Sequence, residues 1–249
     1  MNGPGTADTA GVVGVLGGMG PLATIDFMHK VVSATPASSD QDHVPVVVSS
    51  IPQVPDRTAA FRGDGASPLA AMIASGQRLV HAGVGMVVIP CNTAHLWFGA
   101  IQNALQLPML HLVDAALDDA VAAAGAGSTL GLLCTDATLA SGLYMNRTLP
   151  GDSTGHVRWA LPTANEMLEL VMPGISAVKA GELERGGELL GAAAQALVRR
   201  GAQALVLGCT EVPLVLGPAN VKVPVIDATA SLARRAVAWS MAQRDRKQA

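Results

Sequence analysis

The chain has 249 residues, of which half are hydrophobic and 14% are charged, and its formal net charge is -3. This length suits one large domain or two domains of about 100 to 120 residues. No stretch reaches the roughly 18 uninterrupted apolar residues of a membrane-spanning helix, and no cluster of Lys and Arg indicates a nucleic-acid partner. We therefore expect a soluble protein that binds neither membrane nor nucleic acid. Residues 1–11 read as a flexible lead-in and not as a signal peptide, which favours the cytoplasm.

Short β-branched runs alternate with longer Ala-rich segments along the chain. The strand-like runs are residues 11–18, 44–52, 84–91 and 107–114, followed in the second half by 128–138, 156–163, 202–212 and 221–228. This alternation is typical of parallel sheets that are covered by helices on both faces. The sequence therefore predicts an α/β fold.

The second half of the chain repeats the first at a steady spacing. The matched pairs are Cys91 with Cys209 and Gly83 with Gly201, both 118 residues apart, Gly14 with Gly131, 117 apart, and Pro108 with Pro224, 116 apart. Steady offsets over the whole chain indicate an internal repeat. We predict two similar halves, each with a mainly parallel four-stranded sheet, related by a pseudo-twofold axis with a cleft between them. The predicted domains are residues 1–113 plus 228–249, and residues 114–227.

Two of the three cysteines occupy equivalent places in this repeat. An odd and sparse set of cysteines argues against disulfides and for reduced thiols. Cys91 in "VVIPCNTAH" and Cys209 in "LVLGCTEVP" each end an apolar strand, and ligands of open parallel sheets bind outside these carboxyl ends. We expect both thiols to face one cleft, and Cys134 to be an ordinary core residue.

Two facing thiols suit the inversion of a carbon acid. A thiol at a helix N-terminus has its pKa lowered toward neutrality, so it can act as a base. One thiol could remove a proton from one face of a carbon atom while the other returns a proton to the opposite face, without a cofactor. Backbone N–H groups at the helix starts could hold a substrate carboxylate. The predicted reaction is racemisation.

The motifs "GVLGGMGPLAT", "IPQVPDRT", "PCNTAH", "DATLASGLY", "VKAGE" and "LGCTE" occur in this order over residues 12–235. Together they resemble the aspartate/glutamate racemase superfamily, within it the aspartate racemase branch that works without pyridoxal phosphate. The resemblance implies two Rossmann-like halves, a homodimer and no cofactor or metal. It also implies that Cys91 and Cys209 are the acid/base pair, with Cys91 deprotonating the D-enantiomer and Cys209 the L-enantiomer.

The same resemblance implies a set of substrate-binding residues. Asn92, Thr93, Thr135 and Thr210 match positions that bind the α-carboxylate and amino group, Arg57 and Lys179 match basic residues that bind substrate carboxylates, and Met19 and Glu211 complete the set. Glutamate racemases of cell-wall synthesis have Asp-Ser where this chain has Gly17-Gly18-Met19, and Thr-His where it has Thr210-Glu211. Aspartate is therefore favoured over glutamate.

Other functions are weighed against this interpretation. The glycines of "GVLGGMG" do not form the dinucleotide-binding G-x-G-x-x-G pattern, and no G-x-x-x-x-G-K-[ST] or G-x-S-x-G motif is present. Cys91 and His95 have the spacing of a metal pair but lack further ligands, so we expect His95 to be packed or on a helix surface. A racemase or isomerase of glutamate, hydantoin, maleate or several amino acids stays possible, as does a two-lobed binding protein. Residues 57–68 are the expected mobile segment.

Overall fold

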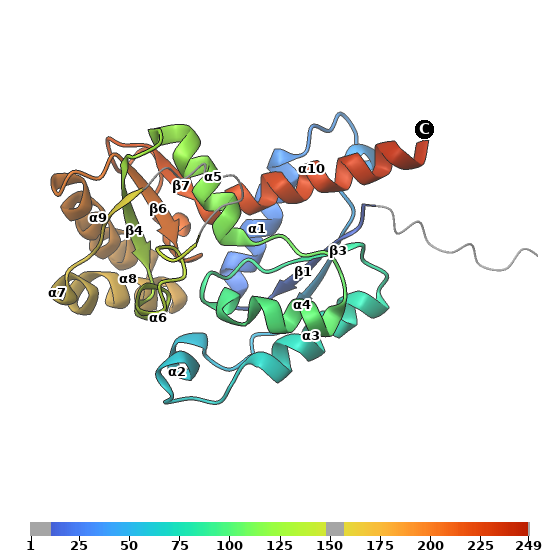
Figure 1. Cartoon of the computed structure of the whole chain (residues 1–249), viewed down its shortest axis with the longest axis horizontal. Helices are drawn as coiled ribbons and strands as arrows, with labels where there is room; N and C mark the ends of the chain where they lie inside the picture. Colours follow the sequence, from blue (N-terminus) through green and yellow to red (C-terminus); the bar gives the residue numbers. More distant parts are fainter. Residues whose placement is uncertain (1–10, 148–156, 249) are drawn as a thin grey trace, which may run out of the picture.

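Two parallel β-sheets form where the sequence places its β-branched runs, one in each half of the chain (Figure 1). The computed structural model describes residues 11–147 and 157–248, so residues 1–10 of the expected lead-in lie outside it. The first sheet has the strand order β2-β1-β3 and the second has the order β5-β4-β6-β7. The bounds are β1 (Val13–Gly17), β2 (Val46–Ser50), β3 (Met86–Val88), β4 (Thr129–Cys134), β5 (Arg158–Ala160), β6 (Ala204–Gly208) and β7 (Val225–Asp227).

The predicted α/β fold is confirmed, with one difference in the number of strands. Every pair of neighbouring strands is parallel. The run at residues 107–114 contributes only an isolated bridge between Val87 and Met109, so the first sheet has three strands and not the predicted four. The run is short because the next helix already begins at Leu112, which leaves too few residues to extend the ladder.

The repeat that the sequence predicts is visible in the turns between helix and strand. Gly83 precedes β3 and Gly201 precedes β6, and their φ angles are 77° and 91°. Glycine adopts this left-handed conformation without the steric cost that a side chain would add. The two halves therefore use the same turn to enter equivalent strands.

Helices cover the sheets and alternate with the strands along the chain. The first half contains α1 (Pro21–Ala34), α2 (Arg57–Arg62), α3 (Leu69–His81), α4 (Phe98–Leu105) and α5 (Leu112–Ala124). The second half contains α6 (Asp136–Ala140), α7 (Ala164–Glu166), α8 (Met172–Lys179), α9 (Leu183–Arg199) and α10 (Ala228–Gln248), and a π-helical turn (Met167–Val171) joins α7 to α8. None of the helices that the structure describes is long and apolar enough to cross a bilayer.

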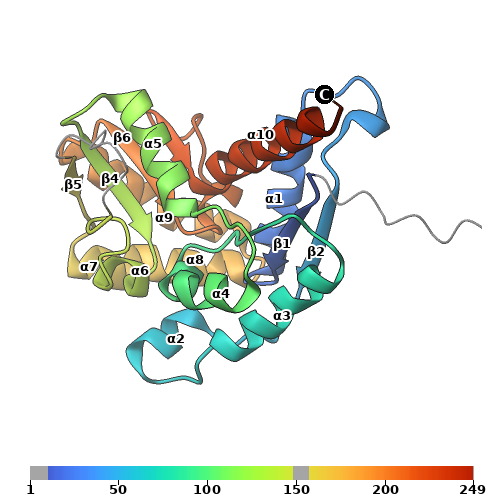
Figure 2. The same ribbon diagram turned by 45° about the vertical axis from the view of Figure 1, so that its right-hand side comes forward.

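The long C-terminal helix α10 connects the two halves. It begins next to β7 and packs along both α5 and α1 (Figures 1 and 2). One apolar cluster contains side chains from both sheets and from these helices, among them Val15, Leu117, Leu132 and Leu232. Full burial of such a side chain stabilises a fold by about 1.5–3 kcal/mol. Because the halves share this cluster, the division into residues 1–113 plus 228–249 and 114–227 stays a prediction.

Candidate active site

Every site residue that the sequence nominates lines one cavity at the carboxyl ends of the strands. The cavity is narrow, and its empty space measures about 280 Å³ including its opening to solvent. It is lined by Met19, Asp56, Arg57, Thr58, Cys91, Asn92, Thr93, Thr135, Lys179, Cys209, Thr210 and Glu211. Sequence reasoning missed Asp56 and Thr58, although both flank Arg57 in the "PDRT" motif. Their place in the cavity follows from the position of α2, which the motif alone does not give.

The two thiols reach the cavity from equivalent strands. Cys91 lies three residues beyond β3, and its N–H donates to the carbonyl of Ile89 at 2.8 Å. Cys209 directly follows β6. Both are buried, with 6% and 4% of their surface exposed. Short 3₁₀ turns follow them, at Thr93–Trp97 and Val212–Leu214, where the sequence predicted the start of α-helices.

The pKa of Cys209 is raised, and the predicted lowering is wrong for this thiol. Burial is the largest cause, and the neighbouring carboxylate of Glu211 adds to it. A three-residue turn aligns few peptide dipoles, so it offers little compensation. The Sγ of Cys209 donates a hydrogen bond to Oε2 of Glu211 at 3.0 Å, and Oγ1 of Thr210 lies 3.4 Å from the same oxygen. Cys209 is therefore held in its thiol form and can donate a proton.

A turn of two glycines places Met19 in the cavity. The φ angle of Gly18 is 88°, and a Cβ atom there would lie 2.4 Å from the backbone nitrogen of Ile51. The N–H of Gly18 donates to Oγ1 of Thr24 at 2.8 Å, which fixes the turn against α1. Only glycine fits this approach of backbone to backbone.

Threonine hydroxyls connect the two halves beneath the cavity. The hydroxyls of Thr93 and Thr135 lie 3.0 Å apart, and the hydroxyl of Thr138 lies 3.0 Å from each of them. Thr135 also caps α6 by accepting from the N–H of Thr138 at 3.2 Å. Thr138 was not nominated from the sequence; it follows Thr135 by three residues and does not line the cavity.

Tyr144 orients one of the cavity side chains from the opposite half. Its hydroxyl donates to Oδ1 of Asn92 at 2.5 Å. The Nδ2 of Asn92 is buried and has no hydrogen-bond partner among the residues that the structure describes. A buried donor without a partner is costly unless a ligand satisfies it. Tyr144 closes the motif "DATLASGLY", but nothing in the motif indicates its contact with Asn92.

The cavity holds two cations and two carboxylates. Arg57 is buried at the start of α2, and its Nη1 donates to the carbonyls of Val54 and Pro55 at 3.3 and 3.2 Å. Its Nε has no partner within residues 11–147 and 157–248. Burial lowers the pKa of Lys179, but the neighbouring acidic groups, Glu211 foremost, together outweigh this effect and the pKa is raised.

Asp56 is the second carboxylate and caps α2. Its side chain accepts from the N–H of Ala59 at 2.8 Å. Burial raises the pKa of Asp56, but this hydrogen bond and the charge of Lys179 outweigh burial, so the pKa is lowered. With Glu211, Arg57 and Lys179, the cavity can therefore pair both positive and negative groups of a ligand.

The helix α2 lies against the second half of the chain. It packs on α6 (Figure 2). Arg62 at the end of α2 forms an ion pair with Asp136. The first residue of α2, Arg57, therefore lines the cavity, and its last residue, Arg62, contacts the second half of the chain. The expected mobility of residues 57–68 stays a prediction.

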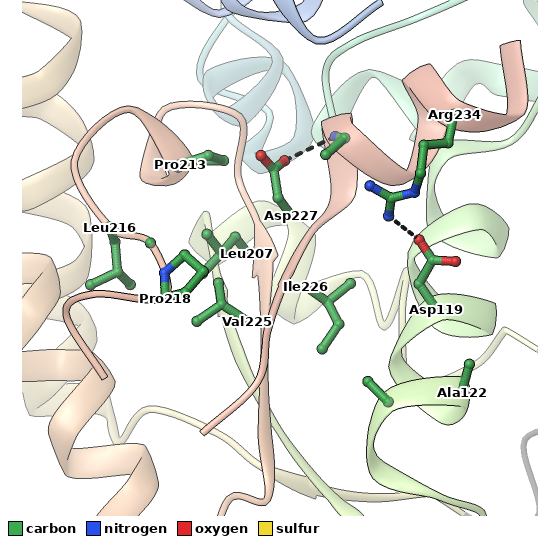
Figure 3. Close-up of a pocket in the computed structure, with 13 residues that line it drawn as sticks. Asp119, Ala122, Leu207, Pro213, Leu216, Pro218, Val225, Ile226, Asp227 and Arg234 are labelled. Carbon is green, nitrogen blue, oxygen red and sulfur yellow. Dashed lines mark hydrogen bonds and ion pairs between the residues drawn. The ribbon is translucent and has the colours of Figure 1, made fainter. Parts of the chain in front are cut away.

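A larger hollow, which no cysteine lines, lies between α5, β7 and α10 (Figure 3). It encloses about 1060 Å³ including its opening to solvent. Its floor is apolar, and its charges are paired: Arg234 donates to Asp119 at 2.5 Å, and Asp227 accepts from the N–H of Ala230 at 3.1 Å. Its lining residues include neither a thiol nor an imidazole. We therefore place the chemistry in the smaller cavity.

The histidine after Cys91 is packed, as expected. His95 is 4% exposed, and both ring nitrogens contact main-chain atoms, so neither is available to a metal. Cys134 is also buried in the core as expected, and burial raises its pKa. Over the described ranges, no group of three or more His, Cys, Asp or Glu has an arrangement that could hold a metal ion.

Known proteins are similar to this chain over nearly its whole length. Residues 16–236 match the family model described as Asp/Glu/Hydantoin racemase. The broad-specificity amino-acid racemase RacX of Bacillus subtilis (strain 168) is 28% identical over 237 residues, which cover 93% of this chain and 99% of the relative. The structure of Picrophilus torridus aspartate racemase has a TM-score of 0.80 at 31% identity, over 92% of this chain and 94% of the other. The structure of a glutamate racemase from Francisella tularensis subsp. tularensis SCHU S4 in complex with D-glutamate shares the fold, with a TM-score of 0.64 at 16% identity, over 94% of this chain and 81% of the other.

Proposed function

This chain is a racemase of the Asp/Glu/Hydantoin racemase family, and we propose that it inverts the α-carbon of aspartate, or of a similar acidic amino acid, without a cofactor. One observation carries the proposal: Cys91 and Cys209, buried side chains from equivalent strands of the two halves, line one cavity. A cofactor-free inversion needs one group on each side of the α-carbon, and the thiols approach from opposite halves.

The proposed reaction moves one proton on each face of the substrate. In one direction the thiolate of Cys91 removes the α-proton of the D-enantiomer, and the thiol of Cys209 donates its proton to the opposite face. The product is the L-enantiomer, with Cys91 left as the thiol and Cys209 as the thiolate. In the other direction the two roles are exchanged. The hydrogen bond from Cys209 to Glu211 supports the first direction of this scheme, in which Cys209 is the proton donor.

The charges of the cavity support an acidic amino acid as substrate. Arg57 and Lys179 supply two cations for two carboxylates, while Asp56 and Glu211 can pair with the α-ammonium group. The unpartnered Nε of Arg57 is a buried donor that a carboxylate would satisfy. The planar guanidinium fits a carboxylate by two parallel hydrogen bonds.

The proposal is tested by following α-proton exchange in deuterated water. Purified, reduced protein without pyridoxal phosphate should exchange the α-proton of L- and D-aspartate and abolish the optical rotation of either. Cys91→Ser should exchange only the L-enantiomer and Cys209→Ser only the D-enantiomer, because each keeps one base. Cys134→Ala is the matched control and should still racemise. The proposal fails if the wild-type protein exchanges no amino acid, or if either of the first two variants still racemises.

A second candidate, racemisation of several amino acids, is favoured by the likeness to the broad-specificity relative. Lys179→Met separates the two. A hydrogen bond to a charged group contributes about 1.5–3 kcal/mol, so a site built for aspartate should lose about 10- to 100-fold in kcat/KM for aspartate and much less for alanine. Equal losses for both substrates would favour broad specificity.

We also propose a homodimer in a reducing compartment such as the cytoplasm. Exposed apolar side chains on α1 and on the edge strand β2, namely Leu22, Ile25, Val32 and Val48, support a surface that a second copy covers. The three unpaired thiols fit a reducing compartment. Sedimentation of the purified protein tests the dimer, and a monomer would contradict it.

A further inference from the structure

His95 connects the backbone of Cys91 to the start of helix α5. Its Nδ1 lies 2.8 Å from the carbonyl oxygen of Cys91, and its Nε2 accepts from the N–H of Leu112 at 3.1 Å. Leu112 is the first residue of α5, which packs on both α10 and β6. A single imidazole therefore ties the loop that carries one thiol to the core of the molecule.

The two contacts determine which nitrogen carries the proton. A carbonyl oxygen can only accept and a backbone N–H can only donate, so Nδ1 carries the hydrogen and Nε2 is bare. Burial lowers the pKa of His95 to about 4, which keeps the ring neutral near pH 7. Two other rings also pack against the imidazole: Phe98 stacks on it with ring centroids 5.5 Å apart, and His111 meets it edge-on with centroids 4.6 Å apart. Its position and tautomer are thus fixed by contacts on every side.

We propose that His95 is a positioning residue that fixes Cys91 relative to the α-carbon of the substrate. His95 does not line the cavity, so it acts through the carbonyl of Cys91 and touches no reacting atom. The inference rests on the proposed role of Cys91 as an acid/base group. Its physical basis is that proton transfer depends steeply on geometry, since a displacement of about 1 Å can cost on the order of 100-fold in rate.

Two amide variants separate the contact to Cys91 from the contact to α5. His95→Asn places an amide near Nδ1, where it can still donate to the carbonyl of Cys91, but it loses the acceptor for Leu112. His95→Gln places an amide oxygen near Nε2, where it can still accept from Leu112, but it loses the donor to Cys91. His111→Gln is the matched control, because His111 is a buried ring of the same cluster with no bond to Cys91 in the described structure.

The expected result is a loss of kcat only where the bond to Cys91 is lost. His95→Gln should lower kcat by about 10- to 100-fold at nearly unchanged KM, and it should raise the α-deuterium isotope effect in the direction in which Cys91 is the base. His95→Asn and His111→Gln should keep kcat within about threefold, even if thermal unfolding shows lower stability. The proposal is overturned if kcat follows stability across the three variants, or if His95→Gln keeps the wild-type kcat and isotope effect.

A readout that needs no turnover distinguishes this inference from the proposed function. The rate of alkylation of Cys91 by iodoacetamide is followed by peptide mass spectrometry, with Cys209 as the internal reference. His95→Gln should change the rate at Cys91 at least about threefold while the rate at Cys209 stays constant. An unchanged ratio overturns the positioning role, whereas absence of racemisation in the wild-type protein overturns only the proposed function.

Discussion

Removal of the hydroxyl of Tyr144 should weaken both the fold and the binding of substrate. Tyr144 is 1% exposed and Asn92 is 2% exposed, so the bond between them is closed to water. Tyr144→Phe leaves Oδ1 of Asn92 buried without this donor, which costs about 1–3 kcal/mol. A change of 1 kcal/mol shifts the Tm of a domain of this size by about 2–4 °C, so Tm should fall by about 2–12 °C.

Substrate binding should weaken because the amide of Asn92 is then free to turn. Burial raises the pKa of Tyr144 well above its ordinary value, so the phenol donates throughout the working pH range. Loss of one net hydrogen bond of about 1 kcal/mol corresponds to an increase in KM of about fivefold.

Calorimetry and initial-rate kinetics measure the two effects, and a double-mutant cycle assigns them. In an Asn92→Ala background there is no Oδ1 that Tyr144→Phe could leave without its hydrogen-bond donor, so the effects of Tyr144→Phe on Tm and KM should largely vanish. If Tyr144→Phe has the same effect in both backgrounds, or leaves Tm and KM unchanged, the hydroxyl does not act through Asn92 and the reasoning is refuted.

Two further predictions concern ion pairs. Arg62→Ala removes the ion pair between α2 and Asp136. Since exposed pairs contribute about 0–1 kcal/mol, KM should rise by up to about fivefold at low salt and by less at high salt. An equal rise at both salt concentrations would contradict this. The hydrogen bond from Arg200 lowers the pKa of Glu166 to about 2 from an ordinary value of 4.5. The pair therefore stabilises the fold above pH 4.5 and loses its effect as pH falls toward 2. The Tm difference between wild type and Glu166→Gln should close over this range, and a constant difference would argue against the linkage.

The sequence predicted most of the fold because the repeat and the strand periodicity are local signals. Gly83 and Gly201 can be paired from their spacing alone, and both adopt the left-handed conformation in equivalent turns. The fourth strand predicted for the first sheet does not form, and the reason is non-local. Its residues are mostly apolar, but α5 begins at Leu112, whose N–H bonds to His95, and nothing within the run reveals that contact.

The side chains nominated from the sequence meet in one cavity because most of them follow strand ends, while Arg57 begins α2 and Lys179 ends α8. Tyr144, which the sequence did not nominate, contacts the site from a distant part of the sequence. Tyr144 contacts Asn92 from 52 residues away, and a pattern of one sequence does not encode such a pair. The raised pKa of Cys209 was missed for a related reason: the motif shows Glu211 two residues on, but only the fold turns its carboxylate onto the thiol.

The repeat also explains how the two thiols can differ. With the 118-residue offset that matches Cys91 to Cys209, Thr93 corresponds to Glu211 and His95 to Pro213. Thr93 bonds to other threonines, whereas Glu211 accepts from the thiol of Cys209. A racemase with two bases needs one thiol and one thiolate at any moment, which two identical environments would not favour. In the proposed mechanism, the backbone repeat therefore places the sulfur atoms symmetrically, and the replacement of Thr by Glu at one equivalent position decides that the proton starts on Cys209.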